Sequence, residues 1–457
     1  MTVPITVYIP CHDYADFVDR AIVSVLDQTY DDWDLIVVDD GSTDGSRKAI
    51  AKYDGNERLT ILHNERPLGL RAVANQCIAA ARGTHVLRLD ADDRLHPHCL
   101  EALARAAAAS PETAIFFSDY FYVDDADNVI GVECLPTSDA GYEATTFPPH
   151  GACSLIRKDV LDELGGYDDD VARQDGHEVW LKLLRSGHRF EHVALPLFYY
   201  RRHGDSLSTD ISGLLEDRGT IMRRLAAGID SDARVIAVVP VKNTYAAMPG
   251  IPFRRVGGVT LLDLAIREAY NVEAVDEVVV TSDADDVVEH VREHWPAAHA
   301  LRRPEELTRP TTTIADVLRH VVEERGLDDD AIIVLLSVHT PRRTAAHVQK
   351  ALDAFHLYGV DSVVSVYEER SLLYQMGQHG LRPLNPSNEG RVRLERDATY
   401  VDTGAVRVLP VRNIRAGTLL GSRIGHALMD VEDSIQIKSP RDFVHLDPVD
   451  VTSDVAP

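Results

Sequence analysis

Short apolar runs alternate with longer stretches of helical spacing at the start of the chain. Four of these runs predict strands, at residues 5–10, 35–38, 59–62 and 86–89. Apolar residues between the first two runs recur at intervals of three and four, which predicts a helix at 17–26, and an alanine-rich stretch predicts another at 69–81. Strands that alternate with helices in this way indicate a parallel, doubly wound α/β sheet.

An acidic cluster follows the fourth of these strands. The apolar run 86–89 ends directly in the carboxylates Asp90, Asp92 and Asp93. Like charges this close repel one another unless a cation is shared, and the carboxyl end of a parallel strand faces the ligand crevice of α/β proteins. Oxygen ligands there suit a divalent cation that takes its other ligands from phosphates. The alternative interpretation is a solvated acidic turn, a common feature of so acidic a chain.

The alternation of strands and helices starts again at residue 235. Strands are predicted at 235–240, 277–281 and 332–336, and helices at 261–269 and 312–324. The second region does not repeat the sequence of the first, so we predict two Rossmann-like nucleotide-binding α/β domains in tandem. Their predicted limits are 1–205 and 234–446, with a helical linker at 206–233 and a disordered tail at 447–457.

The amino-acid composition argues against some classes of binding partner. The chain has 457 residues, enough for two domains, because single cores rarely exceed about 250–300 residues. Its 47 Lys and Arg against 73 Asp and Glu give a net charge of −26, which argues against nucleic acid or an anionic lipid surface. The five cysteines show no CxxC spacing, and no apolar run approaches the about 20 residues of a membrane span. We expect reduced thiols in a cytoplasmic protein, with at most peripheral contact at the inner face of the membrane; an oligomer is not excluded.

Five motifs of the first half occur in an order that resembles family 2 glycosyltransferases of the GT-A fold. They are Val7-Tyr-Ile-Pro10, Ser24-Val-Leu-Asp-Gln-Thr-Tyr30, the stretch 35–45 with its Asp-Asp-Gly-Ser, the stretch 69–75, and Asp90-Ala-Asp-Asp93. The resemblance runs from about residue 4 to about residue 203. It implies an inverting, metal-dependent transfer of sugar from a nucleotide-sugar donor to a glycan or lipid-linked acceptor in surface glycan biosynthesis, with Mg²⁺ or Mn²⁺ as cofactor.

This resemblance also assigns roles to single residues. The nucleotide is expected on Pro10, Asp13, Asp39, Arg71 and Asp90, and the metal on Asp90, Asp92 and His203. The first loop reads Cys11-His12-Asp13 where the family usually has Thr-Tyr-Asn, which leaves the identity of the base open. Arg71 would place a cation against the diphosphate or be a solvated helix residue. His203 would complete the metal shell, touch the diphosphate, or lie on the surface.

The general base is expected at Asp175. The family pattern at this point is Glu-Asp before a helix, and this chain has Gln174 followed by Asp175. Inverting transfer needs a carboxylate that takes the proton of the acceptor hydroxyl while its oxygen attacks the anomeric carbon. The alternative is that Asp175 only caps the helix. His177 and Glu178 are interpreted as surface residues of the first helical turn.

The second half resembles cytidylyltransferases that make CMP-activated nonulosonic acids. The resemblance rests on the stretches 237–241, 250–254, 277–283, 303–307 and 340–344 among others, and it implies nucleotide binding by Lys242, Arg254 and Arg343. The chain departs from the family at the two catalytic magnesium positions, which hold Gln436 and Lys438. We therefore expect a domain without standard cytidylyl transfer. The alternatives are a bifunctional protein that makes a CMP-nonulosonic acid from CTP, or a non-catalytic binding or scaffold module.

Overall fold

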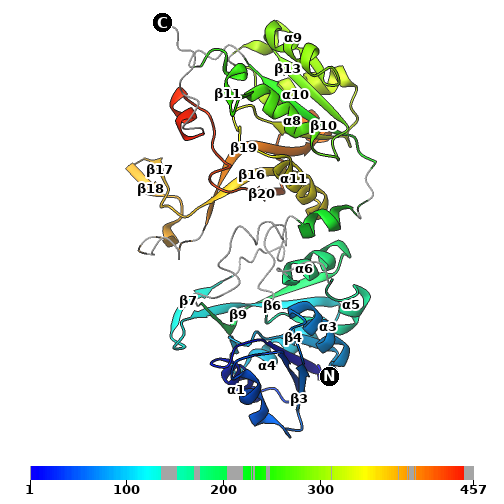
Figure 1. Ribbon diagram of the computed structural model, residues 1–457, viewed down its shortest axis with the longest axis vertical. Coiled ribbons are helices and arrows are strands. Elements are labelled where there is room, and N and C mark those ends of the chain that lie inside the picture. Colours follow the sequence, from blue (N-terminus) through cyan, green and yellow to red (C-terminus); the bar gives the residue numbers. More distant parts are fainter. Residues whose placement is uncertain are drawn as a thin grey trace. The chain divides into compact units, whose positions relative to one another are not determined.

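The chain forms two compact units. The computed structural model describes residues 2–134, 152–168, 175–202, 220–227, 229, 232–242, 248–309, 311–378, 380–388, 390, 396 and 398–446. The units are Met1–Ile221 and Met222–Pro457, and their boundary falls inside the predicted linker, where residues 220–227 are helical. Each unit is an α/β body built around its own sheet (Figure 1). No described helix is both long and apolar enough to cross a membrane.

The first unit holds a nine-stranded sheet in the order β3-β2-β1-β4-β8-β6-β9-β5, with β7 paired to β6. The strands are β1 (Ile5–Cys11), β2 (Trp33–Asp40), β3 (Leu59–Asn64), β4 (His85–Arg88), β5 (Arg94–Leu95), β6 (Thr113–Val123), β7 (Val129–Glu133), β8 (Leu155–Arg157) and β9 (Arg189–Arg201). The helices are α1 (Val18–Leu26), α2 (Ser46–Ile50), α3 (Leu70–Ala80), α4 (Cys99–Ala109), α5 (Lys158–Glu163) and α6 (Asp175–Arg185). The four strands and two helices predicted at the start of the chain are confirmed. The parallel arrangement predicted for the sheet is confirmed for β1 to β4, but β8 runs antiparallel to both β4 and β6, so the sheet as a whole is mixed.

The central strands of this sheet are buried on both faces. Alternate residues of β1 enter different cores: Ile5, Val7 and Ile9 pack with α1 and α4, whereas Tyr8 packs with α3, α5 and α6. Leu35 and its neighbours on β2 divide between the faces in the same way. A strand covered by helices on both faces needs apolar residues at every position. This explains why these strands appear in the sequence as continuous apolar runs.

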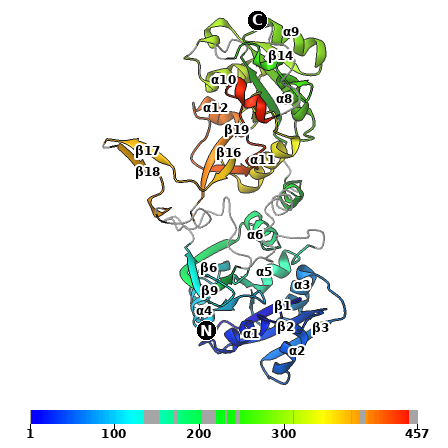
Figure 2. The same ribbon diagram turned by 60° about the vertical axis from the view of Figure 1, so that its left-hand side comes forward.

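The second unit holds a seven-stranded sheet in the order β14-β13-β10-β15-β19-β16-β20. Its strands are β10 (Val235–Val241), β13 (Glu277–Ser282), β14 (His299–Arg302), β15 (Ile332–Leu336), β16 (Ser362–Glu369), β19 (Thr399–Pro410) and β20 (Ile424–Leu428). Its helices are α8 (Leu261–Tyr270), α9 (Asp285–His294), α10 (Ile314–Arg325), α11 (Ala345–Tyr358) and α12 (Val411–Arg415). Two small hairpins, β11 (Arg255–Val256) with β12 (Val259–Thr260) and β17 (Tyr374–Gly377) with β18 (Gly380–Pro383), stand outside this sheet. Figure 2 shows β17–β18 projecting from its own unit.

The two sheets share one strand order. For this comparison, β5 and β7 of the first unit are left out, and the seven remaining strands of each unit are numbered along the chain. Both sheets then run 3-2-1-4-6-5-7. The sixth strand, β8 in the first unit and β19 in the second, is antiparallel to its neighbours. Strands one to four are parallel in both sheets. The second unit thus repeats the topology of the first without repeating its sequence.

A buried acid on α11 makes the stability of the second unit depend on pH. Asp353 is buried, Gln349 Nε2 donates to one carboxylate oxygen at 2.8 Å, and the other oxygen has no hydrogen-bond partner among the described atoms. Burial raises the pKa of Asp353 to about 6. The folded state therefore keeps a proton that the unfolded chain loses near pH 4, and the free energy of unfolding falls as the pH rises from there to about 6.

We expect Asp353→Asn to remove the decrease in the free energy of unfolding between about pH 4 and pH 6, which amounts to about 3 kcal/mol. Urea unfolding between about pH 4 and pH 8 measures it, and the variant should be the more stable protein at the upper end. An unchanged slope against pH would show that Asp353 is not the group responsible.

Candidate functional site

The acidic cluster lies at the carboxyl end of β4, as predicted. Asp90 forms an ion pair with Arg88, with Nε and Oδ1 2.9 Å apart. Asp93 is only 1% exposed, and its Oδ1 accepts the backbone N–H of Arg201 at 2.9 Å. Its Oδ2 has no hydrogen-bond partner among the described atoms. Burial, then the charges of Asp92 and Asp90, raise the pKa of Asp93 well above its usual range.

These carboxylates suit a cation that is only partly coordinated by protein. Among the described residues, no three His, Cys, Asp or Glu side chains converge on one point as a closed metal cage. Mg²⁺ is commonly held by one or two carboxylates and completed by substrate phosphates and water. The concentration of acids at this turn fits such a cation, and Asp90 and Asp92, which unlike Asp93 are only partly buried, are the residues that would hold it. His203, the third predicted ligand, lies outside the described residues.

The loop after β1 lies close to this cluster. Tyr14 is part of that loop, and its pKa is raised by burial and then by the charges of Asp92, Asp90 and Asp93. The neighbouring strand ends meet here because β1 pairs in parallel with both β2 and β4. The loop therefore lies between the end of β2 and the acidic cluster, at the edge of the sheet where α/β proteins bind ligands.

The two carboxylates predicted to bind the base, Asp13 and Asp39, are joined through one turn. Asp13 has φ +59°, and its Oδ1 accepts the backbone N–H groups of Thr43 at 2.7 Å and Asp44 at 3.2 Å. Asp39 is buried and accepts the N–H of Ser42 at 3.1 Å, while Ser42 Oγ accepts the N–H of Asp13. The left-handed backbone at Asp13 is an uncommon conformation that such contacts hold in place. Both acids thus lie at the carboxyl ends of β1 and β2.

Two nitrogen-bearing side chains near Asp39 were missed from the sequence. His63 Nδ1 lies 3.3 Å from Asp39 Oδ2, and Arg47 Nε lies 3.9 Å from the same oxygen. His63 lies opposite Asp39 in the parallel pairing of β2 and β3. The predicted strand stopped at residue 62, so its polar end, which reaches the site, was not recognised. Pro10 of β1, which the first motif predicts to bind the nucleotide, lies opposite Val38 of β2.

The next acid, Asp40, shapes the entrance to α3. Its carboxylate accepts the backbone N–H of Leu68 and of Gly69, both at 2.9 Å. Gly41 follows with φ +66°, and a Cβ there would lie 2.7 Å from backbone atoms of Arg66 and Pro67. Only glycine permits this close approach of two backbones. The Asp-Asp-Gly sequence therefore fixes the loop that leads into α3.

Arg71 and Asn75 of α3 hold the turn that precedes α6. Arg71 Nη1 donates to the carbonyl of Asp168, and Asn75 exchanges two hydrogen bonds with the backbone of Tyr167, at 2.7 and 2.9 Å. Gly166 has φ +69°, and a Cβ there would lie 2.5 Å from Asn75 Oδ1. Arg71 thus joins α3 to the Gly-Gly-Tyr-Asp turn. The sequence had suggested only a contact with the diphosphate or a solvated side chain.

We expect Asn75→Ala to lower the free energy of unfolding of the first unit by about 2 kcal/mol, because it leaves two partly buried backbone groups of Tyr167 without partners. Gln76→Ala is the matched control on the same helix, since the Gln76 side chain accepts only a long 3.5 Å bond from Asn64. Urea unfolding of both variants tests this, and equal losses would contradict the role given to Asn75.

The prediction that His177 and Glu178 lie on the surface is wrong. His177 is buried and Glu178 is 0% exposed. Lys182 explains the burial of Glu178: its Nζ lies 2.9 Å from Glu178 Oε1 and 2.7 Å from Asp168 Oδ1. The Lys182 ammonium group thus connects α6 to the turn at Asp168, to which residues of α3 also bind. Asp175 is the first residue of α6, and its side chain lies outside the described part of the structure.

Arg201, at the end of β9, is a site residue that the sequence did not reveal. Its guanidinium is 1% exposed, donates to the carbonyl of Asp92 at 2.8 Å, and also contacts the carbonyl of Asp124 and the carboxylate of Asp127. Asp127 has φ +66° and is one of three non-glycine residues with a positive φ among the described residues. Arg201 therefore holds the backbone of the acidic turn in place through its hydrogen bond to the Asp92 carbonyl. Its partners are more than 70 residues away in sequence, so no local pattern identifies them.

The predicted residues of the second unit take different positions. Arg343 is buried, and its Nη1 donates to the carbonyls of Ser337 at 2.6 Å and Ala405 at 3.1 Å, while burial lowers its pKa to about 10. Arg254 is exposed, and Lys242 Nζ reaches the carbonyl of Thr308 at 3.4 Å. At the predicted magnesium positions, Gln436 Nε2 donates to the carbonyl of Thr403, and Lys438 is exposed.

Comparison with known proteins identifies the first unit. The family described as Glycosyl transferase family 2 matches residues 6–165. The O-antigen biosynthesis protein RfbC of Myxococcus xanthus is 27% identical over 45% of this chain and 16% of its own length. Hyaluronan synthase of Pasteurella multocida is 24% identical over 46% of this chain and 22% of its own length. The chain thus spans less than a quarter of either relative, and its first half carries a family 2 glycosyltransferase domain.

Among solved structures, the crystal structure of S. aureus TarS 1-349 is 20% identical over an alignment that covers 50% of this chain and 67% of that chain, with a TM-score of 0.40.

Proposed function

We propose that the family 2 domain makes the first unit an inverting, metal-dependent glycosyltransferase of surface glycan biosynthesis, with a nucleotide-sugar donor and a glycan or lipid-linked acceptor. The observation that carries this proposal is the convergence of the Asp13–Asp39 turn and the Asp90–Asp93 cluster on one edge of the sheet, around the ends of β1, β2 and β4. The family match and the two polysaccharide-related names support the class of reaction.

Each residue then has a separate task. Asp13 and Asp39 accept the N–H donors of the base, and Pro10 lies near the end of β1 beside the same site. Asp90 and Asp92 hold Mg²⁺ or Mn²⁺, which when bound offsets the charge of the leaving diphosphate. Arg71 donates to the Asp168 carbonyl through Nη1 and has further N–H donors for the diphosphate, so we assign it both to positioning the turn and to binding the nucleotide. Asp175 accepts the proton of the acceptor hydroxyl, and His203 is proposed as a further metal ligand.

Calorimetric titration of the full chain with UDP, GDP and CDP, in MnCl2 and in EDTA, tests the donor site. We expect one nucleoside diphosphate to bind more tightly with Mn²⁺, and Asp92→Asn to abolish that gain. The matched control is Asp162→Asn, which changes an exposed acid of α5 paired with Lys158. Equal binding by Asp92→Asn and the unsubstituted chain in MnCl2 would contradict the proposed metal site.

We propose further that the second unit is a cytidylyltransferase-like α/β domain that has lost cytidylyl transfer. The Gln436 side chain is bonded to a backbone carbonyl, and a protonated Lys438 does not coordinate Mg²⁺. The alternative is a bifunctional protein that makes a CMP-nonulosonic acid. Incubation of the full chain with CTP, Mg²⁺ and nonulosonic acids should release no pyrophosphate above background, and release at the rate of an authentic synthetase would establish the bifunctional alternative.

A further inference from the structure

The face of the first sheet that α6 covers continues beyond that helix. Successive residues of β6 point to opposite faces of the sheet. Phe116 and Tyr120 pack into the core with α1 and α4, whereas Phe117 lies on the other face, where its ring meets Trp180 of α6 edge-on with centroids 5.5 Å apart. Phe121 shares this face with Phe117, four residues earlier. Among the described residues, however, Phe121 is part of neither core and is only partly buried.

A row of side chains crosses this part of the face from β5 to β7. Arg94 of β5 lies opposite Tyr199 of β9, and Tyr199 lies opposite Phe121 of β6. Phe121 in turn lies opposite Val132 of β7. The rings of Phe121 and Tyr199 stack with centroids 5.1 Å apart, and the Arg94 guanidinium lies 3.6 Å from the Tyr199 ring centroid. Four strands thus contribute to one continuous surface, the cross-strand row.

The cross-strand row changes from cationic to aliphatic with distance from the acidic cluster. Arg94 directly follows Asp93 in the chain, so the row begins at the proposed metal-binding turn. At its far end Val132 is 50% exposed, and Val129 and Ile130 of the same strand are 55% and 52% exposed. Exposed aliphatic residues that gather beside a binding site mark a surface for an apolar partner or ligand. The order of the row therefore fits a ligand with one polar and one apolar end.

We infer that the cross-strand row binds the lipid of a lipid-linked saccharide acceptor. The saccharide lies at the Arg94 end, next to the acidic turn, and the lipid chain lies across Phe121 onto the aliphatic residues of β7. The base proposed at Asp175 belongs to α6, which packs on the same face of β6. This inference rests on the proposed glycosyltransferase activity, and it selects the lipid-linked class from the two classes of acceptor named there.

A single lipid molecule fits this face better than a bilayer does. The turn that joins β6 to β7 carries Asp124, Asp125 and Asp127, and the net charge of the chain is −26. Carboxylates at the tip of a hairpin oppose its insertion among anionic lipids. A lipid chain that lies flat along the cross-strand row avoids this repulsion, because it contacts the aliphatic side chains of β7 and not the acidic turn.

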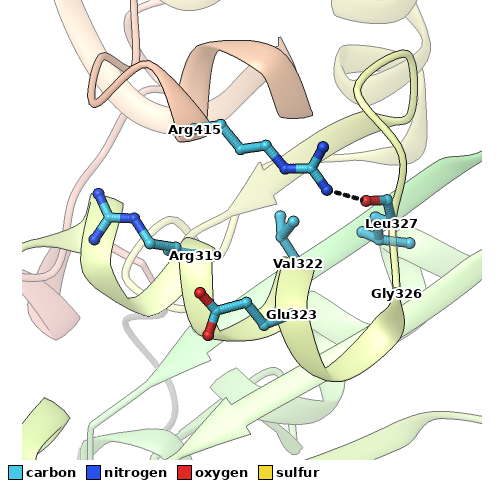
Figure 3. A pocket seen from close by; sticks show the side chains of 6 residues that line it. All are labelled: Arg319, Val322, Glu323, Gly326, Leu327 and Arg415. Atoms are coloured by element: carbon cyan, nitrogen blue, oxygen red, sulfur yellow. Dashed lines mark hydrogen bonds between the residues drawn. The ribbon is translucent and has the colours of Figure 1, made fainter.

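A cavity in the second unit offers a ligand no comparable set of contacts. It measures about 560 Å³ and is bounded by α10 and α12 (Figure 3). Of the two arginines that line it, Arg319 is paired with Asp316 at 3.0 Å, and Arg415 donates to the carbonyl of Leu327 at 2.6 Å. Both cations are thus already bonded to the protein.

Calorimetric titration of the full chain with decyl β-glucoside, below its micelle concentration, and with methyl β-glucoside tests the inference. We expect the decyl glucoside to bind saturably and at least about tenfold more tightly than the methyl glucoside, because binding removes its alkyl chain from water. Ile130→Ser combined with Val132→Ser should abolish this difference. Both side chains are half exposed, so the double variant should unfold at the same urea concentration as the unsubstituted chain. Met376→Ser is the matched control, since Met376 is 77% exposed on hairpin β17–β18 of the second unit, and it should preserve the difference.

Equal binding of the two glucosides, or a difference that survives the double substitution, would overturn the inference. A dimer of the full chain that the same substitutions dissociate would also overturn it, because a second copy would then cover the face. Co-sedimentation with phosphatidylglycerol vesicles that they abolish would assign the face to a bilayer instead. The titration with nucleoside diphosphates in MnCl2 tests the proposed activity separately. If a diphosphate binds and the two glucosides do not differ, the lipid-binding inference fails and the proposed activity stands.

Discussion

Asp175→Asn is expected to lower kcat for sugar transfer by about 10²–10⁴-fold while the donor still binds. Asparagine has nearly the shape of aspartate but cannot take the proton of the acceptor hydroxyl. The residues proposed to bind the donor, Asp13, Asp39 and Asp92, lie on other elements, so the affinity for the nucleoside diphosphate should not change. The loss should therefore appear in kcat rather than in donor binding.

The helix α6, of which Asp175 is the first residue, is held to the first unit by several contacts. The turn that ends at Asp168 is held by Arg71 and Asn75 from α3, and Lys182 joins the same turn to Glu178 inside α6. The helix that begins at Asp175 is therefore anchored against the body of the first unit. A base must be held within hydrogen-bond reach of its substrate, and the anchoring of α6 is the reason for proposing a base on this helix.

Rates of transfer to the acceptor, measured across pH, separate the base from a mere helix cap. The unsubstituted enzyme should lose kcat at low pH as the base becomes protonated, and Asp175→Asn should lack this dependence. Asp162→Asn serves as the control acid, because it lies on α5 and pairs with Lys158 at the surface. A transfer rate unchanged in Asp175→Asn would exclude Asp175 as the base.

The elements that the sequence predicts well are those with a local signal. Strands β1, β2 and β4 are continuous apolar runs because helices cover both faces, and each run ends where a polar turn begins. The position of Asp90 and Asp92 follows directly from this pattern. The same reasoning placed β10 and β15 in the second unit, where the apolar runs again end in polar loops.

The errors concern contacts between distant segments. Three-residue β8 is too short to show a periodicity, so its antiparallel direction was not predicted. Glu178 was assigned to the surface because charged residues are rarely buried, but Lys182 and the distant Asp168 supply the partners that make burial tolerable. Burial of a charged residue depends on partners that only the folded chain brings together.

Arg201→Met is expected to lower the free energy of unfolding of the first unit by about 3 kcal/mol. Methionine fills much of the space of the buried side chain but cannot donate hydrogen bonds. The carbonyls of Asp92 and Asp124 would lose their donor, and Asp127 would lose its buried cation. The position of the guanidinium over Phe17, 4.9 Å from the ring centroid, would be lost as well.

Arg20→Met is the matched control, because Arg20 binds the same Asp127 at 2.8 Å but its side chain is 44% exposed. An exposed ion pair contributes less than about 1 kcal/mol, so this variant should remain close to the unsubstituted chain. Urea unfolding compares the two, with near-ultraviolet dichroism to separate the transitions of the two units. Equal losses would mean that the charge on Asp127, rather than the buried bonds to the Asp92 turn, determines stability. A larger loss in Arg201→Met, together with weaker Mn²⁺-dependent binding of nucleoside diphosphate, would show that Arg201 holds the proposed metal-binding turn in place.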